Sequence, residues 1–250
     1  MSMLDLYGIK EVADVVFWEI NPDGTKGAPV LYLDTLKVST IEETAEQTEA
    51  RGGKGNPPLI IWDYDKEITV TLEDALFSMK SMSVMHSQNV NVQTSTNVAI
   101  PKAGKFVAMA SGSEGLPAAI ASLSSLAIYE ANPAHDDESG VAVPIASSSL
   151  AKGETYLYKY TETAASADTI EISSENFPGT YSITGDTYAR SQRTGKDEFF
   201  QFEIPQAKVN PEQTITMQAE GDPSTFSMTV RVMRPDDHVM MKLTKYPKVD

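Results

Sequence analysis

The chain has 250 residues, of which 41% are hydrophobic, and its 35 acidic and 20 basic residues give a formal net charge of −15. This length allows one large all-β domain or two smaller domains. The sequence contains no cysteine, which excludes disulfides, a thiol nucleophile and a cysteine-based zinc site. The acidic balance argues against a nucleic-acid-binding surface, because such surfaces use cations to displace counterions from phosphates.

The first twenty residues mix acids with apolar side chains and have no basic lead, so they are not predicted to be a signal peptide. No apolar run approaches the length that crosses a bilayer. We therefore expect no membrane partner.

Apolar and polar residues alternate in many short segments separated by turn signals. Val12–Ile20 and Val30–Val38 flank a turn rich in proline and glycine, and similar alternation recurs after residue 154, at 156–160, 200–204, 215–219 and 226–232. Alternation of period two is typical of half-buried strands. The sequence predicts a mainly β fold, a sandwich or barrel.

Residues 39–58 form a long polar connection that ends in Arg51, Gly52, Gly53, Lys54 and Gly55. The glycines around a lysine suggest a phosphate-binding loop, but two prolines follow at once and no serine or threonine stands at the magnesium position. A phosphate-binding loop must instead run into a helix. We predict an extended β-hairpin arm over about 39–58, with the chain returning at Leu59.

One helix is expected over about 72–86. Leu72, Ala75, Leu76, Met79 and Met82 recur at helical intervals, and acids early in the segment suit the positive end of a helix dipole. The methionines could line a binding groove, but packing against a sheet is the commoner use of such a stripe. This predicts a single helix packed on the sheet.

The composition changes between residues 104 and 180. Small residues dominate the first part of this segment, and several prolines interrupt it. We predict that residues 1–103 and 181–250 form the main β domain and that residues 104–180 are an insertion or elaboration of it.

Catalytic and metal-binding patterns are weak. The three histidines are His86, His135 and His238, and the last two stand beside aspartates. Neighbouring side chains in a strand or loop point apart, and the spacing lacks the i, i+4 geometry of a helical zinc motif. We expect no enzymatic activity, no catalytic residue, no metal and no cofactor.

An ordered set of segments resembles the major tail (tail tube) proteins of bacteriophages that infect Gram-positive bacteria. The set is the arm ending "ARGGKGN", then "LIIWDYDKEITVTLEDALFS", and later "TGKDEFFQFEIPQAKV" and "MQAEGDPSTFSMTVRVM". The resemblance covers about residues 10–100 and 180–246.

The resemblance implies a structural virion protein with a tail-tube-like β sandwich or barrel, one packed helix and a long hairpin arm. Six copies would form a ring, and stacked rings would form the hollow tail tube through which DNA is ejected. The arm would reach the adjacent ring, which makes Arg51, Gly52, Gly53, Lys54 and Gly55 the candidate subunit-contact residues.

The implied partners are further copies of the chain and other tail proteins such as the sheath, tape measure, baseplate or terminator. Genomic DNA would pass through the lumen without specific binding, in a virion assembled in the host cytoplasm. The alternative is another virion β-module, such as a capsid decoration or host-attachment protein, and a small β-fold hydrolase is a more remote third reading.

Overall fold

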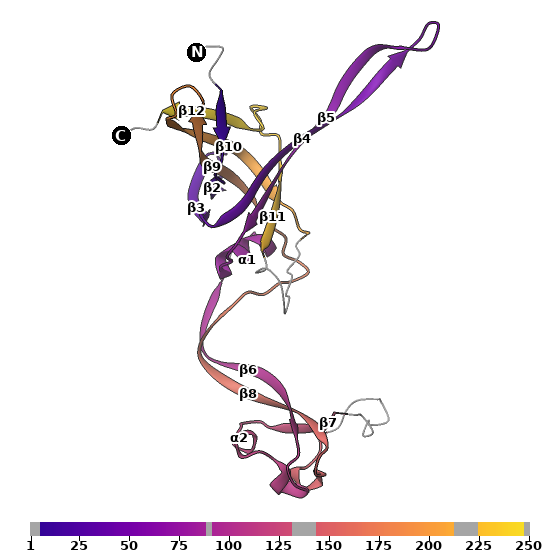
Figure 1. Ribbon diagram of the computed structural model, residues 1–250, viewed down its shortest axis with the longest axis vertical. Helices are drawn as coiled ribbons and strands as arrows, with labels where there is room; N and C mark the ends of the chain where they lie inside the picture. Colours follow the sequence, from indigo (N-terminus) through magenta and orange to yellow (C-terminus); the bar gives the residue numbers. More distant parts are fainter. Residues whose placement is uncertain (1–5, 89–91, 132–143, 213–224, 248–250) are drawn as a thin grey trace. The chain divides into compact units, whose positions relative to one another are not determined.

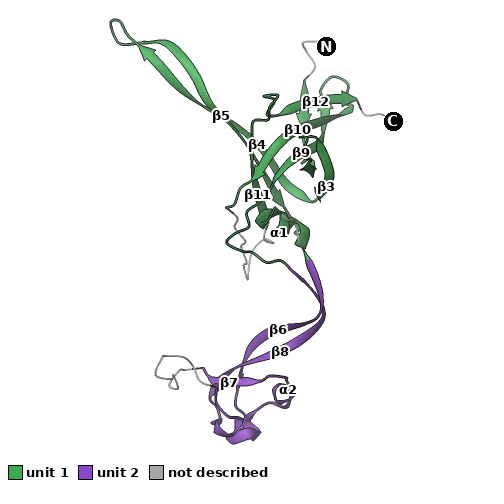
Figure 2. Cartoon of the chain, turned by 180° about the vertical axis from the view of Figure 1, so that it is seen from behind, with its two compact units in different colours: residues 1–92, 170–250 green, residues 93–169 purple. Residues whose placement is uncertain are grey.

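The computed structural model describes residues 6–88, 92–131, 144–212 and 225–247. The chain divides into two compact units, residues 1–92 with 170–250 (unit 1) and residues 93–169 (unit 2) (Figure 2). The segment that the sequence analysis set apart was 104–180, whereas unit 2 begins and ends about ten residues earlier. Each unit is described separately below.

Unit 1 is an antiparallel nine-stranded sheet in which β3, β2, β9, β10, β11, β5 and β4 are neighbours in that order, while β1 pairs with β9 and β12 with β10 (Figure 1). The path runs from β3 to β4 without closing among the described residues. The strands are β1 (Tyr7–Ile9), β2 (Asp14–Ile20), β3 (Lys26–Leu33), β4 (Leu36–Arg51), β5 (Pro58–Asp74), β9 (Thr180–Ser191), β10 (Asp197–Val209), β11 (Phe226–Val232) and β12 (Lys242–Pro247).

Strands from both ends of this sheet contribute to one core. Phe17 of β2 and Val70 of β5 are fully buried in the same cluster as Ile183, Ile204 and Val230. The sheet therefore folds over its own apolar face in the manner of a β sandwich, because each strand points alternate side chains inward. The predicted mainly β class is confirmed.

The helix of unit 1 is shorter than predicted. It is α1 (Met79–His86), and the segment from Leu72 to Asp74 belongs to β5 instead. Ser78 accepts a hydrogen bond from the Ser81 backbone while the Ser81 hydroxyl bonds the Ser78 backbone, a capping box that fixes where the helix begins. The predicted start at residue 72 is wrong because strand alternation with β11 continues to Asp74, and the early acids lie outside the helix.

Met85 and Val84 of α1 are buried against the core of unit 1. Met79 and Met82 are half-buried and lie outside this core cluster, so Met85 is the methionine of α1 that packs in the core. His86 lies at the last turn of this helix.

Unit 2 is a three-stranded antiparallel sheet in the order β6, β8, β7 with its own small core. Phe106, Ile128 and Tyr156 are buried there, and Phe106 stacks on Tyr156 with ring centroids 5.7 Å apart. The elements are β6 (Gln93–Val107), η1 (Gly112–Gly115), α2 (Ala118–Ala121), β7 (Ala127–Glu130), η2 (Ser147–Ser149) and β8 (Thr155–Thr169).

Two predictions from the sequence concern residues that the structure does not describe. The strand expected at 215–219 and His135 lie outside the described residues. Within the described part of the chain, no helix is long and apolar enough to cross a membrane. The short α2 shows that the prediction of a single helix holds for unit 1 but not for the whole chain.

Candidate functional site: the hairpin arm

The arm predicted over about 39–58 is part of a long two-stranded ribbon made by β4 and the first half of β5 (Figure 1). Its returning strand begins at Pro58, so the ribbon extends beyond the predicted end. The two strands pair antiparallel from Leu36 opposite Asp74 to Arg51 opposite Pro58. Only the base of β5, from Thr69 onward, also pairs with β11. Beyond that point both outer edges of the ribbon lack a strand neighbour among the described residues, so the arm stands free of the sheet.

A β-bulge changes which side chains share a face of the arm. Tyr64 and Glu67 are three positions apart on β5, while their partners Glu46 and Thr44 are two positions apart on β4. Asp65 takes the positive φ of 53° at this point. One extra residue reverses the alternation, so Tyr64 lies on the ribbon face opposite to the one that continues into the core.

The tip of the arm is a six-residue turn, and its glycines are explained by backbone geometry. The Gly52 amide bonds the Pro57 carbonyl, and the Asn56 amide bonds the Gly53 carbonyl. Gly55 occupies the third position of that inner turn with φ 85°, as a type II turn requires. Gly53 also has φ 85°. The strand–turn–strand context agrees with the rejection of a phosphate-binding loop.

The two cations of the predicted contact set differ in their surroundings. Arg51 ends β4 and its guanidinium bonds the Glu49 carboxylate, Nε to Oε2 at 2.6 Å. Lys54 is exposed and has no ion-pair partner within the described part of the chain. The structure thus brings Arg51, Gly52, Gly53, Lys54 and Gly55 together at the end of the arm, with Lys54 available to bind an external anion.

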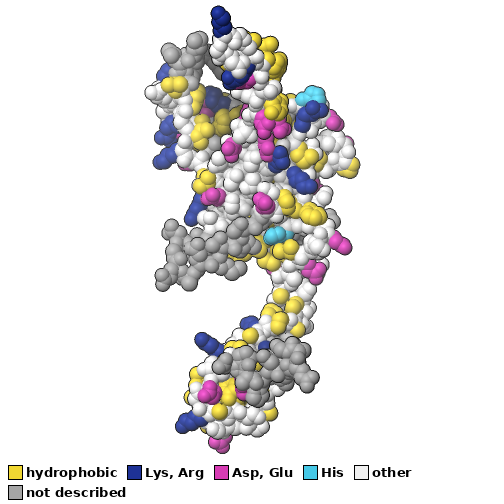
Figure 3. All heavy atoms as spheres, turned by 90° about the vertical axis from the view of Figure 1, so that its right-hand side faces the viewer, with side chains coloured by type: hydrophobic (Ala, Val, Ile, Leu, Met, Phe, Trp, Pro, Cys, Tyr) yellow, Lys and Arg dark blue, Asp and Glu magenta, His cyan; other side chains and the backbone are white. Residues whose placement is uncertain are grey.

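Sequence reasoning missed an apolar stripe on the shaft of the arm. Ile60, Trp62 and Tyr64 lie on one face, opposite Ala50, Thr48 and Glu46. Their exposed fractions are 52%, 50% and 49%, and Figure 3 shows apolar side chains exposed near this end of the molecule. The apolar run Leu59–Trp62 is the feature of the sequence that could have indicated the stripe, but a run of that kind normally indicates a buried strand.

Acidic groups border the stripe. A hydrogen bond to Glu46 is the main cause that raises the pKa of Tyr64, with smaller contributions from partial burial and from Asp65. On the other face Gln47 donates a hydrogen bond of 2.7 Å to Asp63. The arm therefore combines an acidic shaft, an apolar stripe and a basic tip, which suits binding to another macromolecule.

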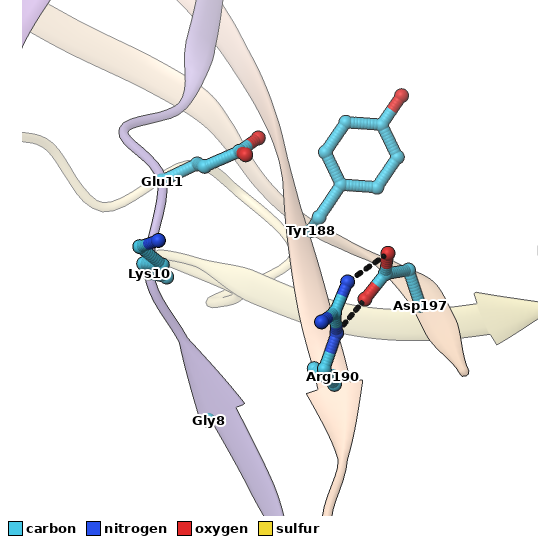
Figure 4. Close-up of a pocket in the computed structure, with 6 residues that line it drawn as sticks. All are labelled: Gly8, Lys10, Glu11, Tyr188, Arg190 and Asp197. Atoms are coloured by element: carbon cyan, nitrogen blue, oxygen red, sulfur yellow. Dashed lines mark hydrogen bonds and ion pairs between the residues drawn. The ribbon is translucent and has the colours of Figure 1, made fainter. Parts of the chain in front are cut away.

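A hollow in unit 1 is lined by charged residues of which two form an ion pair with each other. This hollow of about 320 Å³ lies between β1, β9 and β10, with Lys10 and Glu11 on one side and Tyr188, Arg190 and Asp197 on the other (Figure 4). Arg190 and Asp197 satisfy each other through two hydrogen bonds of 2.6 and 2.8 Å, and this pair raises the pKa of Arg190. A closed ion pair of this kind holds the strands together.

The described residues also show no metal-binding cluster. In the described ranges no three His, Asp or Glu side chains gather as a metal would require. His238 lies in a turn with φ 64°, and His86 is in α1.

A β sandwich with one packed helix and a free hairpin arm is the architecture that the resemblance to tail tube proteins implies. A family model described as the YomU/Tube protein family matches residues 7–246, and the chain belongs to this family. The chain is also similar to a protein of Bacillus phage SPR named "Tail tube protein", with 26% identity over 90 residues. That match covers 36% of this chain and 32% of the relative, so it spans about a third of the relative's length. The resemblance to phage tail tube proteins is confirmed.

Proposed function

We propose that the chain is the structural subunit of a phage tail tube, in which six copies close into a ring and the rings stack into a hollow conduit for DNA ejection. The observation that carries this proposal is the free arm, with its exposed Ile60, Trp62 and Tyr64. A monomer gains nothing from holding these side chains in water on a ribbon without strand neighbours. The arm makes physical sense when a further copy covers it.

Ring closure is supported by the edges of the sheet. Among the described residues β3 pairs only with β2, and β4 only with β5. Unpaired edges expose backbone donors and acceptors that can pair with another chain, and closed rotational symmetry satisfies every such edge in a ring. The hexameric number itself comes from the resemblance.

The tip residues Arg51, Gly52, Gly53, Lys54 and Gly55 are proposed to contact the adjacent ring. Lys54 is free to pair with an acid of that ring, and the net charge of −15 makes acids plentiful. Such pairs set register and association rate more than affinity. The same acidity suits a lumen that DNA passes without specific binding.

The assembled tube would meet other tail proteins such as the sheath, tape measure, baseplate or terminator. Its place would be the virion, after assembly in the host cytoplasm. The role is structural and non-enzymatic, in keeping with a family of tube proteins. The alternative is a capsid decoration or host-attachment module, which would remain a discrete monomer or trimer.

Negative-stain microscopy of the purified protein, with its size distribution in solution, separates these functions. We expect six-fold rings or tubes whose abundance rises with protein concentration. A monomer or trimer that never stacks at high concentration would contradict the tube and favour the alternative.

An arm-truncated variant tests the role of the arm in stacking. Thr44 and Glu67 are paired, so residues 45–66 can be replaced by Asn-Gly, which closes a tight two-residue hairpin. We expect this variant to unfold with the same cooperativity as the wild type and to lose stacking. Tubes of normal length from the truncated chain would show that the arm assignment is wrong.

A further inference from the structure

Unit 1 contains a shallow apolar groove at the base of the arm. The groove has a volume of about 350 Å³ and lies between the β1–β2 connection and the first residues of β4. Ile9, Val12, Val38 and Ile41 line it and are 54%, 37%, 41% and 37% exposed. Four aliphatic side chains of this exposure in one hollow are a feature of binding surfaces.

Two lysines border this groove. Lys10 and Lys37 line it and both are exposed, and neither has an ion-pair partner in the ranges that the structure describes. Glu11 also lies there, so the rim carries a net positive charge of one from these three residues. The chain as a whole is strongly acidic, so the positive rim of this groove differs in charge from the protein as a whole.

The stripe on the arm is complementary to the groove in apolar character and in charge. Ile60, Trp62 and Tyr64 are apolar or aromatic and about half exposed, and Glu46 lies directly opposite Tyr64. Aromatic side chains that enter a pocket commonly supply most of the energy of an interface, and surrounding opposite charges orient the two surfaces. The stripe could thus place aromatic groups in the groove and its carboxylate near a lysine of the rim.

The arm cannot reach the groove of its own chain. Ile41 of the groove pairs with Val70 of β5, and Trp62 precedes Val70 by eight residues on the same strand. At about 3.3 Å per residue, this places the stripe roughly 26 Å further along the ribbon. The strands β4 and β5 stay paired on both sides of the bulge, from Glu46 opposite Tyr64 to Ala50 opposite Ile60 beyond it, so the stripe is held away from the groove of its own chain.

The geometry points to a second copy of this chain, whose arm lays Ile60, Trp62 and Tyr64 into the groove formed by Ile9, Val12, Val38 and Ile41. Because donor and acceptor are different surfaces, the contact is heterologous and repeats from copy to copy. The inference rests on the proposed function and gives the receiving site for the arm.

Site-directed cross-linking tests the contact directly, because the wild-type chain has no cysteine. Thr48 lies opposite Trp62 on the arm, and Val38 lies in the groove. We expect oxidation of a mixture of the Thr48→Cys and Val38→Cys single variants to give a disulfide-linked pair of the two chains. The matched control mixes Thr48→Cys with Lys208→Cys, an exposed position of β10 outside the groove, and should give at least tenfold less.

Two substitutions test the energetics. Trp62→Ala should raise the concentration needed for assembly at least tenfold, while Leu243→Ala, which removes an equally exposed side chain of β12, should leave it unchanged. Glu46→Lys should weaken assembly, and Lys37→Glu in the same chain should restore part of the loss. Thermal unfolding of each variant checks that unit 1 stays folded.

The possible results separate the two proposals. Rings or tubes that form normally, with no Thr48–Val38 cross-link and with Trp62→Ala assembling like the wild type, would overturn the docking and leave the tube function standing. A disulfide between Thr48→Cys and Lys208→Cys, with none between Thr48→Cys and Val38→Cys, would also overturn the docking. Wild-type protein that never forms rings or tubes would overturn the proposed function and the docking with it.

Discussion

Gly185 of β9 lies directly opposite Phe202 of β10, and the phenyl ring covers the glycine. A Cβ atom added at Gly185 would approach Phe202 Cε1 to 2.2 Å. Unit 2 repeats the arrangement, since Gly104 lies opposite Tyr158 and its added Cβ would come 2.7 Å from the ring. In both units an aromatic side chain occupies the space that glycine leaves, which improves cross-strand packing in a sheet.

Gly185→Ala is expected to destabilise unit 1 by about 1–3 kcal/mol, the usual cost of overpacking a filled core. Phe202 is only 3% exposed, so its ring has little room to move away. Chemical denaturation followed by fluorescence measures the change. Gly8→Ala is the matched control, because an added Cβ at Gly8 meets nothing within 4 Å. Equal free energies of unfolding for Gly185→Ala and Gly8→Ala would show that the packing of Phe202 does not require a glycine at position 185.

Tyr181→Phe is expected to raise the free energy of unfolding by about 1 kcal/mol, because an unsatisfied buried hydroxyl carries a desolvation cost. Tyr181 is 4% exposed, and its hydroxyl finds no hydrogen-bond partner in the part of the chain that the structure describes. The ring would keep its edge contact with Phe17, with centroids 6.0 Å apart. A loss of stability would instead indicate that the hydroxyl is bonded in solution.

The same residue gives a pH prediction. Burial, with a smaller contribution from Glu19, raises the pKa of Tyr181. The folded state therefore holds the phenolic proton more tightly than the unfolded state. The free energy of unfolding is unaffected by this ionisation below the ordinary pKa of about 10, and it falls as the pH rises from there through the raised pKa of the folded state. We expect the stability of the wild type to fall more steeply above pH 10 than that of Tyr181→Phe, as measured by urea unfolding across that range.

Ser78→Ala is expected to cost about 1 kcal/mol, the usual cost of losing a helix N-cap. The Ser78 hydroxyl accepts the Ser81 amide at 3.0 Å, and α1 has no acidic residue in its first turn to compensate. Amide hydrogen exchange over Met79–Met85 should accelerate in this variant. Unchanged exchange would show that core packing alone holds the first turn.

The β class and the existence of a hairpin arm could be predicted from the sequence, because alternation and turn residues are local signals. Residues 68, 70 and 72 alternate as buried positions, but the same stretch contains apolar spacings that fit a helix, and only pairing with β11 decides between them. The exposure of Trp62 could not be predicted either, since a strand's solvent accessibility depends on which neighbours it lacks. The groove assembles residues from β1, β4 and β9, which no local pattern connects.

Removal of unit 2 is expected to leave unit 1 folded. Among the residues that the structure describes, the core of unit 1 contains none from 93–169, and the core of unit 2 contains none from outside that range. Gln93 and Thr169 are paired, so the excised ends are adjacent and a short Gly-Ser linker can join residues 92 and 170. We expect one cooperative unfolding transition for the shortened chain, with a midpoint within a few degrees of that of unit 1 in the full chain. Loss of cooperative unfolding would show that unit 2 stabilises the sandwich. Retained assembly of the shortened chain would further place ring formation in unit 1, where the arm and the groove both lie.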